Sequence, residues 1–160
     1  MTTVAKAQHF QGLTTERLTV RRFQMSDLDA FVAIRNDPEV ARYQSWSALN
    51  LAAAQVFIAA MSSAEPGVAG AWFQFALAEK STNQFIGDCA LHIKADEPRH
   101  AEIGFTLARQ AHGQGLATEA LTALFDYLFQ THKLLRLIAI CDVRNRGSIA
   151  LLEQIGRAHV

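Results

Sequence analysis

The stretch that decides the fold is Ala108-Arg109-Gln110-Ala111-His112-Gly113-Gln114-Gly115-Leu116-Ala117-Thr118, between a short apolar segment (103–107) and a long amphipathic one. This order predicts a strand that turns directly into a helix. Gly113 and Gly115 let the backbone come close to a ligand, and the first turn of a helix offers unpaired N–H groups and the positive end of its dipole. We therefore expect the junction to bind an anion, most naturally a phosphorylated ligand.

Two familiar phosphate-binding motifs do not fit this junction. A Walker loop needs Lys followed by Ser or Thr after its last glycine, whereas Leu116 and Ala117 follow Gly115. A dinucleotide fingerprint would have Gly or Ala in place of Thr118 and an acidic residue at the end of the next strand, but the next apolar run (134–141) ends in cysteine. The sequence therefore disfavours both ligand classes.

What remains is the form Gln/Arg-x-x-Gly-x-Gly/Ala, which Gln110, Gly113 and Gly115 satisfy. It resembles the acetyl-CoA pyrophosphate loop of the GNAT superfamily of N-acetyltransferases. Further matches come in the order seen in the RimJ/RimL-like branch, which acetylates the alanine or serine N-termini of ribosomal proteins. They are Thr15 to Arg21, Ser26-Asp27, Asn36 to Tyr43, Ala101 to Phe105, and Asn145-x-x-Ser148.

This resemblance implies an α/β chain with the GNAT fold, in which a mixed, mostly antiparallel twisted sheet has a central parallel β-α-β crossover and flanking helices. It implies an acetyl-CoA-dependent N-acetyltransferase that moves an acetyl group to a primary amine, such as the N-terminus of a ribosomal protein, without a metal. Two alternatives are an acetyltransferase for small amines or antibiotics and a non-catalytic CoA-binding domain.

The resemblance also assigns the expected site to particular positions. The acetyl-CoA site would use Phe105, Thr106, Leu107, Gln110, His112, Gly113, Gln114, Gly115, Leu116, Ala117, Thr118 and Asn145. Backbone N–H groups of residues 105–107 would stabilise the oxyanion, beside a strand bulge at Gly104. Asn145 and Ser148 would contact the pantetheine arm and the thioester, and Ser148 would donate to the departing sulfur. Their alternative roles are a helix cap and a first-turn serine.

Glu102 is the candidate general base, because the alternation of its strand places it opposite the apolar row. There it would accept a proton from the amine through a water molecule. Its alternative roles are a solvent-facing residue or an ion-pair partner of Arg99 or Arg136. Asp88 and His92, on the polar face of the neighbouring strand, are weaker candidates for the base.

The composition limits the partners and the location of the protein. Lys and Arg number 15 and Asp and Glu number 15, with no basic run, so nucleic-acid binding has no electrostatic support. No apolar stretch approaches the roughly 20 residues that span a bilayer, so we expect a cytoplasmic protein without membrane contact. No cluster of His, Cys and carboxylates has metal-ligand spacing. Cys89 and Cys141, both in apolar strand patterns, are expected to be reduced, buried thiols.

Hydrophobic periodicity predicts one domain over residues 1–160, with a loose tail at 1–12. It predicts strands at 17–23, 71–78, 84–93 and 100–107, and helices beginning near 26, over 47–61, over 113–131 and after 145. The run 134–141 is nearly all apolar, which is typical of a strand buried on both faces. With the preceding strand and helix it would form a right-handed parallel crossover.

The last residues are Gln154-Ile155-Gly156-Arg157-Ala158-His159-Val160, whereas members of the resembled family continue with an aromatic residue and about two more strands. One reading frame of a common sequencing-library adapter encodes Ile-Gly-Arg-Ala-His-Val and then a stop. We therefore expect 154–160 to be a non-native ending and native sequence to end near Glu153; the alternative is a natural short variant. The C-terminal strands, and the tyrosine that is the general acid in many family members, would then be missing.

Overall fold

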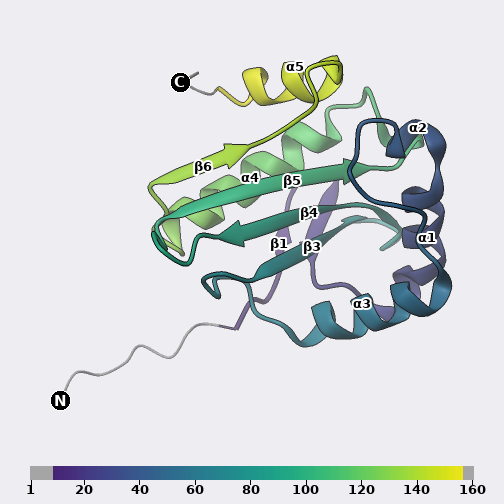
Figure 1. The fold of residues 1–160 in the computed structure, drawn as a ribbon, viewed down its shortest axis with the longest axis horizontal. Helices are drawn as coiled ribbons and strands as arrows, with labels where there is room; N and C mark the ends of the chain where they lie inside the picture. The colour runs from purple at the N-terminus through teal and green to yellow at the C-terminus, as the bar shows by residue number, and fades with distance from the viewer. Residues whose placement is uncertain (1–8, 157–160) are drawn as a thin grey trace.

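The computed structural model describes residues 9–156, which form a six-stranded sheet in the order β1-β2-β3-β4-β5-β6 with helices on both faces (Figure 1). The strands are β1 (Leu13–Thr14), β2 (Leu18–Arg21), β3 (Trp72–Glu79), β4 (Phe85–Ile93), β5 (His100–Leu107) and β6 (Arg136–Ala139). The helices are the short 3-10 turns η1 (Met25–Asp27) and η2 (Arg109–Ala111) and the α-helices α1 (Leu28–Asn36), α2 (Pro38–Ala41), α3 (Leu51–Ser63), α4 (Leu116–Gln130) and α5 (Arg146–Gln154). Neighbouring strands are antiparallel except β5 and β6, which are parallel and joined through α4. The predicted mixed sheet with one parallel crossover is confirmed.

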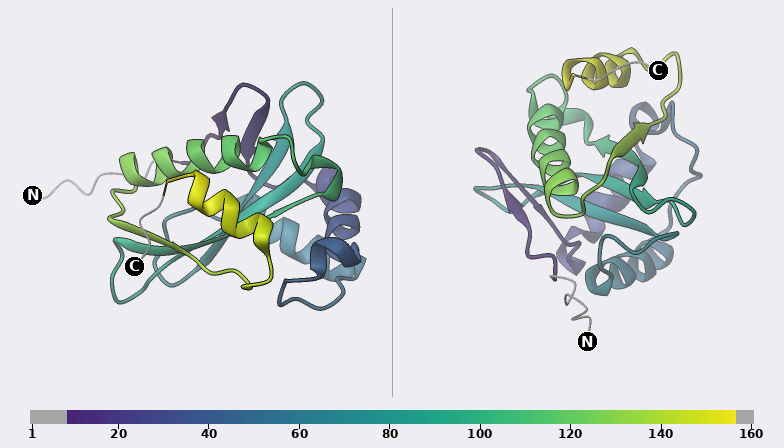
Figure 2. Two further views of the ribbon diagram at one scale, coloured as in Figure 1. Left: turned by 90° about the horizontal axis from the view of Figure 1, so that it is seen from above. Right: turned by 90° about the vertical axis from the view of Figure 1, so that its left-hand side faces the viewer.

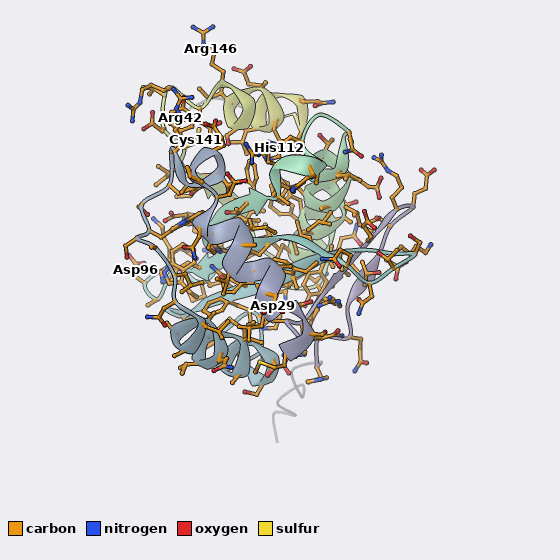
Figure 3. The ribbon with its side chains drawn as sticks, turned by 90° about the vertical axis from the view of Figure 1, so that its right-hand side faces the viewer. Asp29, Arg42, Asp96, His112, Cys141 and Arg146 are labelled. Atoms are coloured by element: carbon orange, nitrogen blue, oxygen red, sulfur yellow. The ribbon has the colours of Figure 1, made fainter. Side chains whose placement is uncertain are left out.

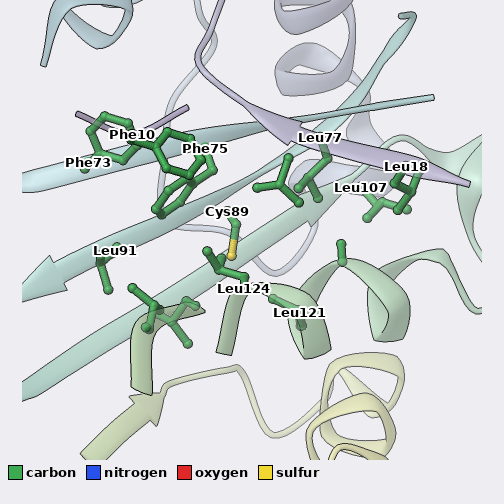
Figure 4. Packing of buried hydrophobic residues seen from close by; sticks show 14 of the residues in the cluster. Phe10, Leu18, Phe73, Phe75, Leu77, Cys89, Leu91, Leu107, Leu121 and Leu124 are labelled. Carbon is green, nitrogen blue, oxygen red and sulfur yellow. The ribbon is translucent and has the colours of Figure 1, made fainter. Parts of the chain in front are cut away.

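Helix α4 covers one face of the sheet because its apolar residues recur at helical spacing. Leu121, Leu124 and Leu128 form one stripe, and each is at most 1% exposed. They belong to a single buried cluster with alternate residues of the strands, among them Phe75 and Leu91 (Figure 4). This packing fixes the N-terminus of α4 just beyond the end of β5.

Helices α1 and α3 lie on the opposite face of the sheet (Figure 2). Aromatic rings dominate this second cluster: the ring centroids of Phe23 and Phe31 are 5.3 Å apart, and that of Phe85 is 5.3 Å from Phe23. Ile58 of α3 is fully buried among them. The sheet is therefore covered on both sides, and α1 is held against β4.

The run 134–141 differs from the prediction. Strand β6 covers only Arg136–Ala139, and its residues are exposed or half-buried. Leu135 is 64% and Ile140 75% exposed, and Cys141 lies beyond the strand and is only partly buried. The prediction of a strand buried on both faces is wrong, because β6 is the last strand of the described sheet and pairs only with β5.

Other boundaries shifted for local reasons. The helix predicted at 47–61 begins at Leu51, because the Asn50 side chain caps it by accepting the Ala53 N–H at 2.8 Å. The α4 helix begins at Leu116, after the glycines. No helix within residues 9–156 is both long enough and apolar enough to cross a membrane.

The expected loose tail is wrong at its C-terminal end. Phe10 is 4% exposed, and its ring centroid lies 5.2 Å from that of Phe75 in the core. Its N–H donates to the Glu65 carboxylate at 3.1 Å, which ties the segment to the end of α3. The rest of that tail (1–8) and the end of the expected non-native segment (157–160) lie outside the described residues.

Candidate active site

The site begins where β6 parts from β5. The two strands pair from His100 and Arg136 to Ile103 and Ala139, and β6 then ends. Strand β5 continues to Leu107, still paired with β4 on its other edge. One edge of β5 is therefore open over residues 104–107.

The backbone of that open edge presents N–H groups to the gap. The Lys94 N–H donates to the His100 carbonyl and the Ala108 N–H to the Ile86 carbonyl, so even-numbered residues of β5 bond to β4. Odd-numbered residues face the other way, and Phe105 and Leu107 therefore direct their N–H groups toward the side that β6 has left.

Gly104 is not a bulge. The β4–β5 register runs without a shift from Gly87 and Leu107 to Ile93 and Ala101, so the expected bulge is wrong. A Cβ at Gly104 would meet no atom within 4 Å, which also excludes a role in close packing. The gap arises instead because β6 is short.

The loop after β5 has the geometry of an anion site. Gly113 (φ 73°) and Gly115 (φ 75°) both adopt the left-handed conformation, which favours glycine. Gly115 precedes α4 without a side-chain cap, and the first intrahelical bond runs from the Glu119 N–H to the Gly115 carbonyl. The N–H groups of Leu116, Ala117 and Thr118 therefore lack intrahelical acceptors.

A groove of about 530 Å³ joins this loop to the open edge of β5. From the expected set it brings together Phe105, Thr106, Leu107, His112, Gly113, Gly115, Leu116, Ala117, Thr118, Asn145 and Ser148. Gln110 and Gln114 do not line it; the Gln114 side chain donates instead to the Gln110 carbonyl at 2.8 Å. The His112 Nε2 lies 2.9 Å from the Leu107 carbonyl oxygen, which fixes the ring against the end of β5.

Sequence reasoning missed part of the groove wall. Glu39, Val40, Tyr43 and Gln44, from α2 and the loop after it, also line the groove. Glu39, Val40 and Tyr43 fall within the Asn36-to-Tyr43 motif, which was read only as a family signature, and Gln44 follows that motif directly. An ion pair of 3.3 Å between Arg109 and Asp37, the cap of α2, brings this segment against the loop.

A second groove of about 450 Å³ adjoins the first and contains Glu102. Tyr43, Gln44, Phe105, Asn145 and Ser148 line both grooves. Figure 3 places Arg42, His112 and Cys141, from three distant parts of the sequence, toward the same end of the molecule, beside α5. Two grooves that share a wall suit a reaction between two substrates that enter from different sides.

Glu102 is half-buried at the wall of the second groove. Arg99 pairs with Glu97 at 3.0 Å, and within residues 9–156 neither it nor Arg136 pairs with Glu102. The two ion-pair alternatives for Glu102 are therefore wrong.

Asn145 caps α5 by accepting the Ser148 N–H at 3.1 Å, as expected of its structural role. Within the described residues the Ser148 hydroxyl has no hydrogen-bond partner, and it lies where the two grooves meet. Nearby, hydrogen bonds from Arg144 lower the pKa of Asp142 to about 2, so that Asp142 is an anion at neutral pH.

The other two candidate bases line neither groove. Asp88 is 2% exposed and accepts two hydrogen bonds from Arg35 Nη2, at 2.8 and 2.9 Å. Burial raises its pKa to about 6, although the charge and hydrogen bonds of Arg35 oppose the shift. His92 stacks on Trp72, with ring centroids 4.9 Å apart.

Arg35 also holds the loop that carries Tyr43. Its guanidinium lies 4.1 Å from the Trp46 ring centroid, and the Trp46 Nε1–H donates to the Arg35 carbonyl at 3.0 Å. Asn36 bonds both the N–H and the carbonyl of Leu49 at 2.8 Å. These contacts fix both ends of the segment that walls the two grooves.

No group of three or more His, Cys, Asp or Glu side chains in residues 9–156 could hold a metal ion. The two grooves bring together backbone donors, a carboxylate and a hydroxyl, beside a loop with the geometry of an anion site. Such an arrangement fits a phosphorylated thioester on one side and an amine on the other.

Comparison with known proteins identifies the family of the chain. Residues 17–157 match the model of the acetyltransferase (GNAT) domain. The chain is 33% identical over 146 residues to the uncharacterized N-acetyltransferase p20 of Bacillus licheniformis, and the match covers 91% of this chain and 81% of the relative. A GNAT-family acetyltransferase from Bacillus anthracis has a TM-score of 0.79 at 26% identity, over 91% of this chain and 82% of that one.

RimL, a ribosomal alpha-N-protein acetyltransferase solved in complex with coenzyme A, shares the fold with a TM-score of 0.75 at 17% identity, over 91% of this chain and 83% of that one. The domain match spans most of the chain, and the loop with Gly113 and Gly115 opens the helix of its parallel crossover. The chain therefore belongs to the GNAT family and is an acetyl-CoA-dependent N-acetyltransferase.

Proposed function

We propose that this protein acetylates the N-terminal α-amino group of a protein, with a ribosomal protein as the leading candidate. The observation that carries the proposal is the meeting of two grooves at Phe105, Asn145 and Ser148, one on the anion-binding loop and the other containing Glu102. Two further supports are the sequence motifs of the RimJ/RimL-like branch and the shared fold of RimL.

The chemistry of the second groove, which contains Glu102, suits an α-amino group. The attacking amine must be neutral, and a free α-amino group has a pKa of about 8, compared with about 10.4 for a lysine side chain. At neutral pH, a carboxylate that acts through water therefore removes a proton more easily from an α-amino group than from a lysine side chain. In the proposed reaction Glu102 accepts that proton as the nitrogen attacks the thioester carbonyl.

The remaining groups handle the other charges of the reaction. The N–H groups of Phe105 and Leu107 donate to the developing oxyanion, and preorganised donors of this kind contribute strongly to acyl transfer. The Ser148 hydroxyl donates to the departing sulfur. A thiol pKa near 8.5 makes the thiolate a fair leaving group, so this demand is mild.

The test measures thiol release from acetyl-CoA with a panel of N-terminal peptides and a library of small amines. We expect turnover with peptides beginning in alanine or serine. Glu102→Gln should lower kcat/KM by about 10²- to 10⁴-fold with acetyl-CoA binding unchanged. Asp126→Asn, an exposed acid on α4 outside both grooves, is the matched control and should retain full activity.

Three results would count against the proposal. Turnover with small amines alone would make the protein a small-amine acetyltransferase. Coenzyme A binding without turnover on any amine would make it a CoA-binding domain. Full activity of both Glu102→Gln and Ser148→Ala would show that these roles are assigned to the wrong residues.

A further inference from the structure

The hairpin of β1 and β2 is fastened to the first turn of α4 through one acid. The Thr15 hydroxyl and the Arg17 backbone N–H donate to Glu119 Oε2, at 2.5 and 2.9 Å. Arg17 Nε donates to Glu119 Oε1 at 2.8 Å. Glu119 thus accepts three hydrogen bonds from Thr15 and Arg17, which lie in the turn between β1 and β2.

Arg17 also holds the anion-binding loop itself. Its Nη1 donates to the Gln114 carbonyl at 2.9 Å, and Gln114 lies between two glycines with positive φ. Glycines allow many orientations of the peptide planes, so this loop needs a restraint from outside. Because the C=O and N–H of a trans peptide point in opposite directions, a fixed Gln114 carbonyl turns the Gly115 N–H away from Arg17.

The groove lies on the side away from Arg17. Gly115 lines the groove and Arg17 does not. Figure 2 shows α4 between the β1–β2 hairpin and α5, and residues of α5 form another wall of the groove. The Gly115 N–H is therefore directed toward the space where the pyrophosphate of acetyl-CoA would bind.

Arg17 balances charge at the same place. Burial raises the pKa of Glu119, but hydrogen bonds from Thr15 and Arg17 outweigh it and the net pKa is lowered. Glu119 is therefore an anion in the first turn of α4, where it would repel a bound phosphate. The Arg17 guanidinium offsets this charge at 2.8 Å, and its Nη2 lies 3.6 Å from where a Gly115 Cβ would stand.

We propose that Arg17 is a positioning residue for acetyl-CoA, which aims the Gly115 N–H at the pyrophosphate and offsets the charge of Glu119 without contacting the ligand. This inference rests on acetyl-CoA binding and not on the identity of the acceptor amine. It can fail while the proposed acceptor is correct, and the reverse is also possible.

The experiment compares Arg17→Met and Arg17→Lys with the wild type in calorimetric titrations with CoA and with dephospho-CoA, which keeps the pyrophosphate but lacks the 3′-phosphate. The matched control is Arg99→Met, which removes another exposed arginine paired with a glutamate, outside both grooves. Amide NMR spectra follow the Gly115 N–H, and circular dichroism checks that each variant is folded.

For Arg17→Met we expect the Kd of CoA and of dephospho-CoA to rise equally, by about 10-fold or more, as fits the loss of a charge-assisted hydrogen bond. The Arg17→Lys variant keeps the charge but cannot bond Glu119 and Gln114 with one planar fork, so its loss should be intermediate. In the wild type, CoA should shift the Gly115 amide proton downfield, and this shift should be smaller in Arg17→Met.

An unchanged Kd in Arg17→Met would overturn the proposal, as would a loss for CoA that dephospho-CoA does not share, which would indicate contact with the 3′-phosphate. A Gly115 amide shift equal to that of the wild type would also overturn it. If Arg17→Met does not fold, the same comparison is made with Arg17→Lys, and an unchanged Kd there has the same consequence.

Discussion

Replacement of Arg35 by methionine is expected to destabilise the protein by about 3–5 kcal/mol at neutral pH, because it leaves a buried carboxylate without its partner. Asp88 is 2% exposed, and its two oxygens both accept from Arg35. The variant also loses the cation–π contact of Arg35 with Trp46, at 4.1 Å. Since a domain of this size has a free energy of unfolding of about 5–15 kcal/mol, the variant should lose a large fraction of it.

The charge on Asp88 gives this prediction a pH dependence with a definite sign. Burial raises the pKa of Asp88 from 3.8 to about 6, so the folded protein retains a proton that the unfolded chain has already lost between these values. The contribution of Asp88 to the free energy of unfolding should therefore be highest below pH 4 and should decrease as the pH rises through 6. About 2 pKa units correspond to about 3 kcal/mol. A protonated Asp88 needs no cationic partner, so the deficit of Arg35→Met should shrink on acidification.

Urea unfolding, followed by tryptophan fluorescence and circular dichroism between pH 4 and 8, measures these effects. The double variant Arg35→Met/Asp88→Leu removes both charges and should be close to the wild type in stability, because a buried ion pair can be replaced by apolar side chains at little cost. Equal destabilisation in Arg35→Met and in the double variant would refute the reasoning. So would a deficit of Arg35→Met that grows as the pH falls from 7 to 4.

Two further predictions concern the site and the sheet. An acceptor peptide that begins in alanine or serine should slow the alkylation of Cys141 by iodoacetamide, because Cys141 lines the second groove with Glu102. Cys89 should not react in the folded protein, since it is buried and burial raises its thiol pKa; peptide mass spectrometry distinguishes the two cysteines. Gly87→Ala should lower the thermal midpoint by several degrees, since its Cβ would lie 2.2 Å from a backbone oxygen of β5, whereas Gly104→Ala, whose Cβ meets nothing within 4 Å, should not; calorimetry of both variants checks this.

The sequence predicts best where one short segment contains the whole signal. Gly113 and Gly115 follow a strand and lie before an amphipathic helix, and this local order was enough to predict a glycine-containing junction between the two. The contacts that hold the loop could not be predicted in the same way. Arg17 and Glu119 are 102 residues apart, and charges at that separation have no periodicity to connect them.

Burial of polar residues and exposure of apolar ones were the main errors. Asp88 alternates with apolar neighbours and was read as part of a polar face, but α1 covers that face and supplies Arg35 as its partner. Ile140 belongs to an apolar run and is nevertheless 75% exposed. Periodicity shows which residues share a face, but only the packing of the helices decides whether the face is covered.

The short β6 explains why the site lies where it does. Because β6 ends at Ala139, four residues of β5 keep a free edge, which at about 3.3 Å per residue is about 13 Å long. An extended ligand arm along this edge could take the place of a strand and accept from the Phe105 and Leu107 N–H groups. The same strand leads through η2 into the Gly113–Gly115 loop, so the donors proposed for the thioester and those proposed for the pyrophosphate lie on one continuous piece of backbone. A longer β6 that paired as far as Leu107 would close the edge, and we expect that it would abolish transfer while leaving the loop able to bind an anion.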